Sequence, residues 1–527
     1  MLAQVITEAP EFVPLASLAN QVSALPKLAI AQQEVVQFVR PHIDWHAFAP
    51  ELILLGWGAL VTIVDLIGLD RVRRLIAPLT GIGFLLAMIP VLTLWDQSAD
   101  LPRVLFDGAY VVDNYALVLK GLFLLSGYVV VLLSSNYMAD GDYYDSEFYQ
   151  LMAASVLGML VMTSARDLIS IFIALELLSI PAYLLAAWRK RDLKSNEAGL
   201  KYMLMGVFAS GILLYGMSLL YGLAGDTRLS MIGEALADGE STPLITLGVL
   251  FTIIGFGFKV SAVPFHTWAP DTYEGAPTPL TAFVAVASKA AGFVALMNVV
   301  FFAFADQADL VEPFMWILAT ATMTVGNLIA LRQTNVVRML AYSGIAQAGY
   351  MLAPLAVYGG RLADAQQSIV LYLLIYAAMN LGAFVVVIIA ARRTRSGEIS
   401  SFGGMFRYAP GLTLAMTIFL FSLAGVPPMG GFWAKFFVFK VLTDGWALWG
   451  TLLALVAAVN SVIAAYYYLN VAKQMWFMPA PDDDHSPIVI PPALVAALAI
   501  TVLVTMITGV TGLAPDWTDF SILAAAP

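Results

Sequence analysis

The sequence contains no cysteine and little charge. The absence of cysteine from all 527 residues excludes disulfides, thiolate-held iron–sulfur clusters, cysteine-ligated zinc and any thiol nucleophile. Charged residues make up only 12% of the chain, against about 25% in soluble globular domains, and 60% of the residues are hydrophobic. This composition is typical of an integral membrane protein, and one polytopic bundle is favoured over several soluble domains.

Histidine is also scarce. The four histidines, His42, His46, His266 and His485, fall in or beside predicted loops, which argues against a haem held by two histidines between helices. We therefore expect no redox cofactor and no metal in this chain. The net charge of −10 comes from acidic loop stretches such as 138–147 and 482–484, which indicate a solvated surface and no nucleic-acid partner.

Apolar stretches of about 20 residues, the length that crosses a bilayer as a helix, recur along almost the whole chain. They predict an all-α polytopic membrane protein, because continuous apolar runs lack the alternation of a barrel strand. We expect about 14 transmembrane helices, near residues 50–69, 75–95, 114–134, 147–164, 167–188, 199–222, 243–265, 279–304, 310–331, 336–358, 366–391, 408–443, 447–472 and 487–510. Residues 1–49 have no basic segment before an apolar core, so we interpret them as an interfacial N-terminal extension.

Basic residues are unevenly distributed between the two sides of this topology. Fourteen of the 26 follow odd-numbered spans, and six lie on the opposite side, tails included. Because basic residues favour cytoplasmic loops, both termini are predicted to lie outside the cytoplasm. The remaining six are all lysines within predicted spans, and lysine is the basic side chain that burial can neutralise. They are Lys120, Lys201, Lys259, Lys289, Lys435 and Lys440.

Ionisable residues inside a membrane indicate function by default, because each costs about 2.5–3.5 kcal/mol on insertion scales. Glu176 lies well inside the fifth span, five residues before Pro181. A protonated structural carboxyl is the alternative interpretation. Lys289, in the eighth span, has small neighbours that leave room for close packing and water. Snorkelling remains the alternative for Lys289.

Two spans are interrupted by proline. Lys259 precedes Pro264 by five residues, and Lys435 follows the prolines and glycines of 427–431. Transporters place ion sites at such breaks, although Lys259 could also snorkel. The interrupted seventh and twelfth spans are five apart, which predicts two inverted five-helix repeats, spans 4–8 and 9–13. We therefore expect domains at residues 50–134, 147–304, 310–472 and 487–510.

Other ionisable residues carry weaker predictions. Lys201 lies near the cytoplasmic end of the sixth span, where function and snorkelling are equally open. Lys120 is expected mainly to snorkel, and Glu51 only to cap a helix or reach the interface. Lys440 is expected to be an interfacial anchor. His266 could titrate near neutral pH and gate a cytoplasmic opening, or simply anchor its loop.

Together, one carboxyl and several lysines on separate spans predict a proton path. Water and polar side chains such as Ser343, Gln347, Tyr350 and Asn380 would join the titratable groups. A membrane scaffold without transport and a substrate permease are the alternatives. We expect Glu176 and Lys259 to form a pair whose charges stabilise each other when close, whereas desolvation favours the neutral form of each.

Several runs of sequence resemble a known family. They include LELLSIPAYLL, GFGFKVSAVPFHTWAPDTYEGAPTP, ASKAAGF and FSLAGVPPMGGFWAKF, and the likeness covers about residues 50–510. The family is subunit N of bacterial NADH:quinone oxidoreductase, respiratory complex I, whose relatives include subunits M and L and multi-subunit cation/proton antiporters. The resemblance implies a proton-translocating, antiporter-like subunit with fourteen helices in two inverted repeats. It also implies a bacterial inner membrane location.

Partners and site residues follow from the same resemblance. It places NAD, FMN, iron–sulfur clusters and quinone in partner subunits, and implies contacts with the lipid bilayer and with antiporter-like and small membrane subunits of the complex. The residues that match the family's proton-translocating positions are Glu176, Lys201, Lys259, Lys289 and Lys435. Gln347 departs from the histidine of many relatives. Because glutamine cannot exchange a proton at physiological pH, water must bridge any path at this point.

Overall fold

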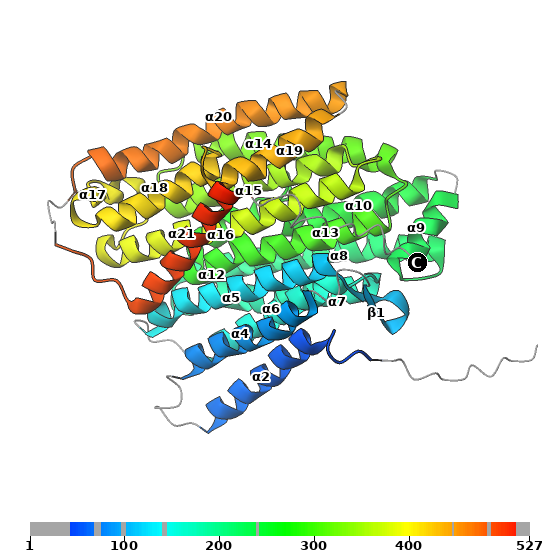
Figure 1. The fold of residues 1–527 in the computed structure, drawn as a ribbon, viewed down its shortest axis with the longest axis horizontal. Coiled ribbons are helices and arrows are strands. Elements are labelled where there is room, and N and C mark those ends of the chain that lie inside the picture. Colours follow the sequence, from blue (N-terminus) through cyan, green and yellow to red (C-terminus); the bar gives the residue numbers. More distant parts are fainter. Residues whose placement is uncertain are drawn as a thin grey trace, which may run out of the picture. The chain divides into compact units, whose positions relative to one another are not determined.

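A computed structural model of the chain describes residues 43–67, 75–95, 102–139, 145–238, 242–444, 447–481 and 486–512. His42, His485 and residues 1–42 of the predicted N-terminal extension lie outside these ranges. The described part is built from helices and one short hairpin (Figure 1).

The first part comprises three helices and the hairpin. Helix α2 (Ala49–Leu66) packs on α4 (Ile76–Trp95), and α4 packs on α5 (Asn114–Ala139). Strands β1 (Arg103–Leu105) and β2 (Tyr110–Val112) pair antiparallel around the turn η1 (Phe106–Gly108). The hairpin thus lies directly before α5 and brings Tyr110 close to the start of that helix.

The next part runs from α6 to α13, and its elements follow one another closely in sequence. They are α6 (Asp145–Ser164), α7 (Leu168–Ala186), α8 (Leu193–Ala224), α9 (Leu229–Asp238), α10 (Pro243–Lys259), α11 (Trp268–Gly275), α12 (Thr278–Phe283), the π-helical turn η2 (Val284–Ser288) and α13 (Lys289–Phe302). Helix α8 packs along α10 and α11, so it borders both sides of the interruption between them. A Cβ at Gly216 of α8 would lie 2.6 Å from the backbone nitrogen of Thr252, which explains the small residue at this close approach.

The last part runs from α14 to α21. Its elements are α14 (Ala308–Ala330), α15 (Val336–Leu352), η3 (Ala353–Ala356), α16 (Leu362–Thr394), η4 (Ile399–Phe402), α17 (Met405–Tyr408), α18 (Pro410–Ala424), α19 (Gly430–Thr443), α20 (Leu448–Phe477) and α21 (Pro492–Thr511). Helix α21 packs against α16, α5 and α19 (Figure 1). The C-terminal helix therefore joins the last part to the first.

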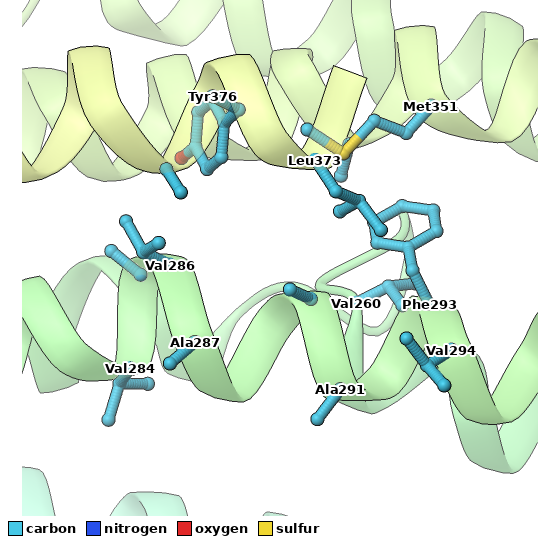
Figure 2. Close-up of a cluster of buried hydrophobic side chains, with 14 of the residues drawn as sticks. Val260, Val284, Val286, Ala287, Ala291, Phe293, Val294, Met351, Leu373 and Tyr376 are labelled. Atoms are coloured by element: carbon cyan, nitrogen blue, oxygen red, sulfur yellow. The ribbon is translucent and has the colours of Figure 1, made fainter. Parts of the chain in front are cut away.

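Two helical segments form the centre of the bundle. Every residue from Pro279 to Phe301 is buried, and residues 365–390 of α16 are buried with only two exceptions. Figure 2 shows Val286 and Phe293 facing Leu373 and Tyr376 of α16. Lys289 lies between Val286 and Phe293 in the chain, so the sequence inserts an ammonium group into the most thoroughly buried part of the protein.

The helices support a multi-pass membrane protein. Within the described ranges, ten helices are long and apolar enough to cross a membrane, and α10 and α18 are shorter apolar helices. Each of the fourteen predicted spans overlaps at least one helix of the structure. The polytopic helical class is confirmed, whereas the count of fourteen crossings stays a prediction.

Both predicted interruptions are present in the structure. Helix α10 ends at Lys259, and α11 begins only at Trp268; between them Ser261 adopts a left-handed backbone conformation with φ 61°. Helix α18 ends at Ala424, Gly425 is left-handed with φ 89°, and α19 begins at Gly430. Prolines lie in both gaps, where a residue without a backbone amide cannot continue the helical hydrogen bonds.

Candidate functional site

Lys259 is buried at the C-terminal end of α10, and its side chain is only 3% exposed. Its Nζ donates hydrogen bonds to Ser179 Oγ at 2.8 Å and to the Tyr202 hydroxyl at 3.3 Å. It also lies 5.9 and 5.5 Å from the ring centroids of Tyr183 and Tyr202, within the range of cation–π attraction. Two hydroxyls and two aromatic faces therefore surround the ammonium.

Glu176 lies on α7, one helical turn before Ser179. Its carboxylate accepts a hydrogen bond from Ser210 Oγ of α8 at 2.5 Å and is only partly buried. In the described residues no ion pair within 4.0 Å joins Glu176 to Lys259. The expected pair is thus close in the fold but not in contact, and each partner is held by a serine instead.

Lys289 begins α13 directly after the π-helical turn, a feature that is frequent at functional sites. Its side chain is 2% exposed, and Nζ donates to the carbonyl oxygen of Gly344 on α15 at 2.8 Å. Lys289 is therefore held by the backbone of the neighbouring helix α15.

Lys435 lies beyond the second interruption, in α19, and is 5% exposed. Its Nζ donates to the carbonyl oxygen of Ala424, the last residue of α18, at 2.9 Å and lies 4.8 Å from the centroid of the Tyr350 ring. The helix end explains this contact, because the final carbonyls of a helix have no partner within it. The break provides the acceptor for the lysine.

A polar network on α15 lies between Lys289 and Lys435. Ser343 and Gln347 both bond the hydroxyl of Tyr468, at 2.5 and 3.2 Å. The Gln347 amide also donates to the Leu423 carbonyl at 3.0 Å and accepts from Tyr372. Gln347 is therefore held on three sides, one turn from Gly344, the acceptor of Lys289. Elsewhere on α16, Asn380 donates to the Tyr376 hydroxyl at 3.0 Å.

The three buried lysines Lys259, Lys289 and Lys435 are called the lysine row. Two other residues that the sequence predicts for the site, Lys201 and His266, lie away from it. The Lys201 side chain is 43% exposed and forms ion pairs with Glu197 at 2.6 Å and Asp271 at 2.7 Å. His266 is half-buried in the loop after α10, where burial lowers its pKa below the ordinary value. A titrating or gating role for His266 stays a prediction.

The sequence prediction was wrong for Lys120 and Glu51. Lys120 does not snorkel: it is fully buried in α5, and its Nζ lies 2.8 Å from Glu51 Oε1 of α2 and 3.0 Å from the Tyr110 hydroxyl. Glu51 is 2% exposed, so it neither caps a helix at the surface nor reaches the interface. The two side chains form an ion pair, and Tyr110 of the hairpin accepts a hydrogen bond from Lys120.

The three lysines of the row share one property, which is that their hydrogen-bond acceptors are uncharged. In the described residues none of Lys259, Lys289 and Lys435 has a carboxylate oxygen within 4.0 Å; hydroxyls and main-chain carbonyls accept their hydrogen bonds instead. The described ranges also hold no group of three or more histidine, cysteine or acidic residues that could bind a metal. Fold and site together define a polytopic helical membrane protein with ionisable side chains buried along its interior.

Comparison with known proteins gives the family. The family model described as NADH:quinone oxidoreductase/Mrp antiporter, TM, matches residues 165–463. NADH-quinone oxidoreductase subunit N of Trichlorobacter lovleyi is 39% identical over 476 residues, which cover 89% of this chain and 94% of that protein. NAD(P)H-quinone oxidoreductase subunit 2 of Synechocystis is 41% identical, with 81% of each chain covered.

Solved structures agree. A chain of respiratory complex I from Thermus thermophilus superimposes with a TM-score of 0.75 and 32% identity, covering 89% of this chain and 100% of that one. A chain of the Mrp complex from Dietzia has a TM-score of 0.78 at 18% identity, which shows the fold alone. The chain belongs to the NADH:quinone oxidoreductase/Mrp antiporter membrane family and, within it, to the subunit N family of NADH-quinone oxidoreductases. The resemblance seen in the sequence is confirmed.

Proposed function

We propose that this chain translocates protons across the membrane as the N subunit of an NADH:quinone oxidoreductase, driven by redox chemistry in other subunits. The observation that carries the proposal is the row of Lys259, Lys289 and Lys435, each at most 5% exposed and hydrogen-bonded to uncharged acceptors. An ammonium without a counter-charge in a low-dielectric interior is costly, so each lysine can lose its proton when its surroundings change.

The proton moves along the row by exchange between lysines and water. Glu176 controls the charge of Lys259, and Ser179 and Tyr202 hold that ammonium when the carboxylate is apart. Lys259 passes its proton towards Lys289, and the polar network at Gln347 and Tyr468 lies on the way to Lys435. Since the Gln347 amide does not titrate, water carries the proton past it. Lys201 and His266 act at the approach to the row.

The membrane arrangement is part of the proposal. The chain crosses the bacterial inner membrane fourteen times, with both termini outside the cytoplasm. Residues 147–304 and 310–472 form the two inverted repeats, flanked by helices at 50–134 and 487–510. Support comes from the two interrupted helices, α10–α11 and α18–α19, each of which has a buried lysine beside the interruption. Lys259 precedes the gap between α10 and α11, whereas Lys435 follows the gap between α18 and α19.

Partner subunits complete the enzyme in this proposal. Electron transfer from NADH through FMN and iron–sulfur clusters to quinone takes place in other chains, and antiporter-like and small membrane subunits border this one. Mild detergent extraction tests the assignment. Co-purification with NADH dehydrogenase and iron–sulfur subunits is expected, whereas co-purification with only small antiporter subunits would assign the chain to a cation/proton antiporter.

Lysine-to-methionine variants test the row. Lys259→Met and Lys435→Met remove the titratable group and keep an apolar side chain of similar length, so both are expected to lower proton pumping per NADH in vesicles containing the complete complex. Lys440→Met is the matched control, because Lys440 is exposed on the same helix as Lys435. Subunit content is measured in parallel. Normal pumping by fully assembled Lys259→Met and Lys435→Met complexes would leave a membrane scaffold as the better assignment.

A further inference from the structure

A stacked aromatic pair lies beside Lys259, and a polar cavity lies one helical turn further along the same two helices. The rings of Tyr202 on α8 and Trp268 on α11 lie almost parallel, with centroids 4.4 Å apart and planes 10° apart. Both side chains are buried, and Trp268 Nε1 donates to the Phe258 carbonyl at 3.1 Å, directly beside Lys259. The two buried rings pack against each other between α8 and α11, beside Lys259.

The polar cavity lies on the far side of the stack. It has a volume of about 160 Å³ and is lined by charged side chains of α8, α11 and α15, among them Glu197, Lys201, Asp271, Glu274 and Arg338. Lys201 and Arg338 both contact Asp271, at 2.7 and 2.9 Å, and Arg338 also contacts Glu274 at 2.9 Å. The exposure of the Glu197 side chain, 62%, shows that this cluster reaches the surface.

Helix periodicity fixes the order of these features. Ala198, which lines the cavity, is one turn from Tyr202 along α8, and Asp271 is one turn from Trp268 along α11. Thr272 Oγ1 donates to the Ala198 carbonyl at 3.5 Å and joins the two helices at this level. On the other side of the stack, the Tyr202 hydroxyl accepts from Lys259. Cavity, aromatic stack and Lys259 therefore follow one another along α8.

Trp268 lies at a helix end where the backbone is not held by a continuous helix, so its side chain could change position. It is the first residue of α11, directly after the irregular segment 260–267, so the helix end that carries it is not continuous with α10. The ion pairs of Asp271 hold the same short helix to α8 and α15. The pKa of Asp271, which burial alone would raise, is lowered by hydrogen bonds from Lys201 and Arg338, so this carboxylate stays ionised and acts as a fixed charge.

We propose that the cavity is where protons are collected from the membrane face that carries loops 187–192 and 331–335, and that the Tyr202–Trp268 stack is the gate between this cavity and Lys259. The inference rests on the proposed function and names the approach to its first lysine. When the stack opens, water in the cavity delivers a proton to the neutral amine of Lys259. The amine becomes an ammonium ion, and the proton lost by the cavity water is replaced from bulk water.

Removing the tryptophan tests the gate in the complete complex. Trp268→Ala is expected to raise the passive proton permeability of vesicles several-fold after an acid jump without NADH, and to lower the protons pumped per NADH. Trp268→Phe retains an aromatic ring and should restore tight vesicles. Trp316→Ala is the matched control, because Trp316 also stacks on another ring, that of Trp449 at 4.8 Å, but on α14 and α20.

The outcomes separate the gate from the proposed function. In a Trp268→Ala/Lys259→Met double variant the leak should disappear, because the open gate would lead to an amine that is no longer there. If Lys259→Met stops pumping while assembled Trp268→Ala vesicles stay as tight as those of the natural protein, the gate is wrong and the lysine row stands. If the Lys259→Met complex pumps normally, the proposed function itself is contradicted, and with it the gate.

A second variant keeps the inference testable if Trp268→Ala does not assemble. Glu197→Cys introduces a thiol into the cavity wall, in place of a side chain that is 62% exposed, in a chain that has no other cysteine. A membrane-impermeant, charged thiol reagent should react from the face that carries loop 187–192 and reduce pumping, with the unmodified variant and the reagent-treated natural complex as references. Reaction only from the opposite face, or full pumping after complete modification, would overturn the assignment of the cavity.

Discussion

Lys289 donates a hydrogen bond to the main-chain carbonyl oxygen of Gly344, and this 2.8 Å contact joins α13 to α15. The two helices belong to the two predicted repeats, so the buried ammonium of one half is held by the backbone of the other. Gly344 has no side chain to displace the ammonium, and Tyr376 of α16 lies against the same point. The geometry at Gly344 therefore controls the position of the central lysine.

A methyl group at Gly344 should disturb this contact. In Gly344→Ala the new Cβ would lie 2.9 Å from the Tyr376 hydroxyl and 3.1 Å from Lys289 Nζ, so one of the two side chains must move. We expect protons pumped per NADH to fall several-fold in vesicles with normal subunit content. Gly211→Ala is the control, because nothing lies within 4 Å of a Cβ there. Equal pumping by both variants would contradict a role for the Lys289 position.

Glu176 and Lys259 should act as one unit although they are not in contact. Glu176→Gln keeps the shape but removes the charge that influences Lys259, so it should lower pumping and slow coupled NADH oxidation, as should Lys259→Met. Because both changes disable the same unit, the effects in the double variant should be far from additive. Pumping and NADH oxidation are measured together with subunit content. Normal pumping by an assembled Glu176→Gln complex would rule out the proposal that Glu176 controls the charge of Lys259.

The buried pair Glu51–Lys120 should behave differently from the row. Lys120→Met leaves a buried carboxylate without its partner, which should destabilise the protein by about 3–5 kcal/mol, whereas replacing both charges with apolar groups is often neutral. Lys120→Met should therefore reduce the amount and thermal stability of the assembled complex, and Glu51→Leu/Lys120→Met should recover both. Complexes that do assemble should pump normally, because the contacts of the pair are with each other and with Tyr110.

The orientation can be measured because the natural chain has no cysteine. Arg191→Cys lies after α7 and Glu234→Cys lies on α9, and both positions are exposed. A membrane-impermeant thiol reagent should label Arg191→Cys from the cytoplasm and Glu234→Cys from the opposite face. The reverse pattern would invert the proposed topology, and labelling of both from one face would remove a crossing between them.

Local chemistry in the sequence predicts the broken helices and their lysines. Proline lacks the backbone donor that a helix needs, so the breaks near Pro264 and in 427–431 are visible without coordinates. The burial of Lys259 and Lys435 beside these breaks follows from the cost of an exposed charge in lipid. The carbonyl that holds Lys435 could also be anticipated in kind, because every helix end leaves unpaired carbonyls.

Contacts between distant segments could not be predicted in this way. Glu51 and Lys120 are separated by 69 positions, and each one alone lies close enough to the end of its span to suggest snorkelling. Only the packing of α2 on α4, and of α4 on α5, shows that they meet. The same holds for Lys201, whose partner Asp271 comes from the short helix α11, and for the serines that hydrogen-bond Glu176 and Lys259.

The acceptors of Lys289 and Lys435 are main-chain oxygens, and this has a consequence for how the protein can vary over evolutionary time. A side-chain ligand can be deleted by one nucleotide change, but every amino acid brings the same carbonyl to positions 344 and 424. Mutation can shift these two oxygens, yet it cannot abolish them. Point substitution of the partner residues therefore cannot remove the acceptor oxygens, and selection acts on the lysines themselves, on the backbone path that presents the carbonyls and on the side chains that could crowd them.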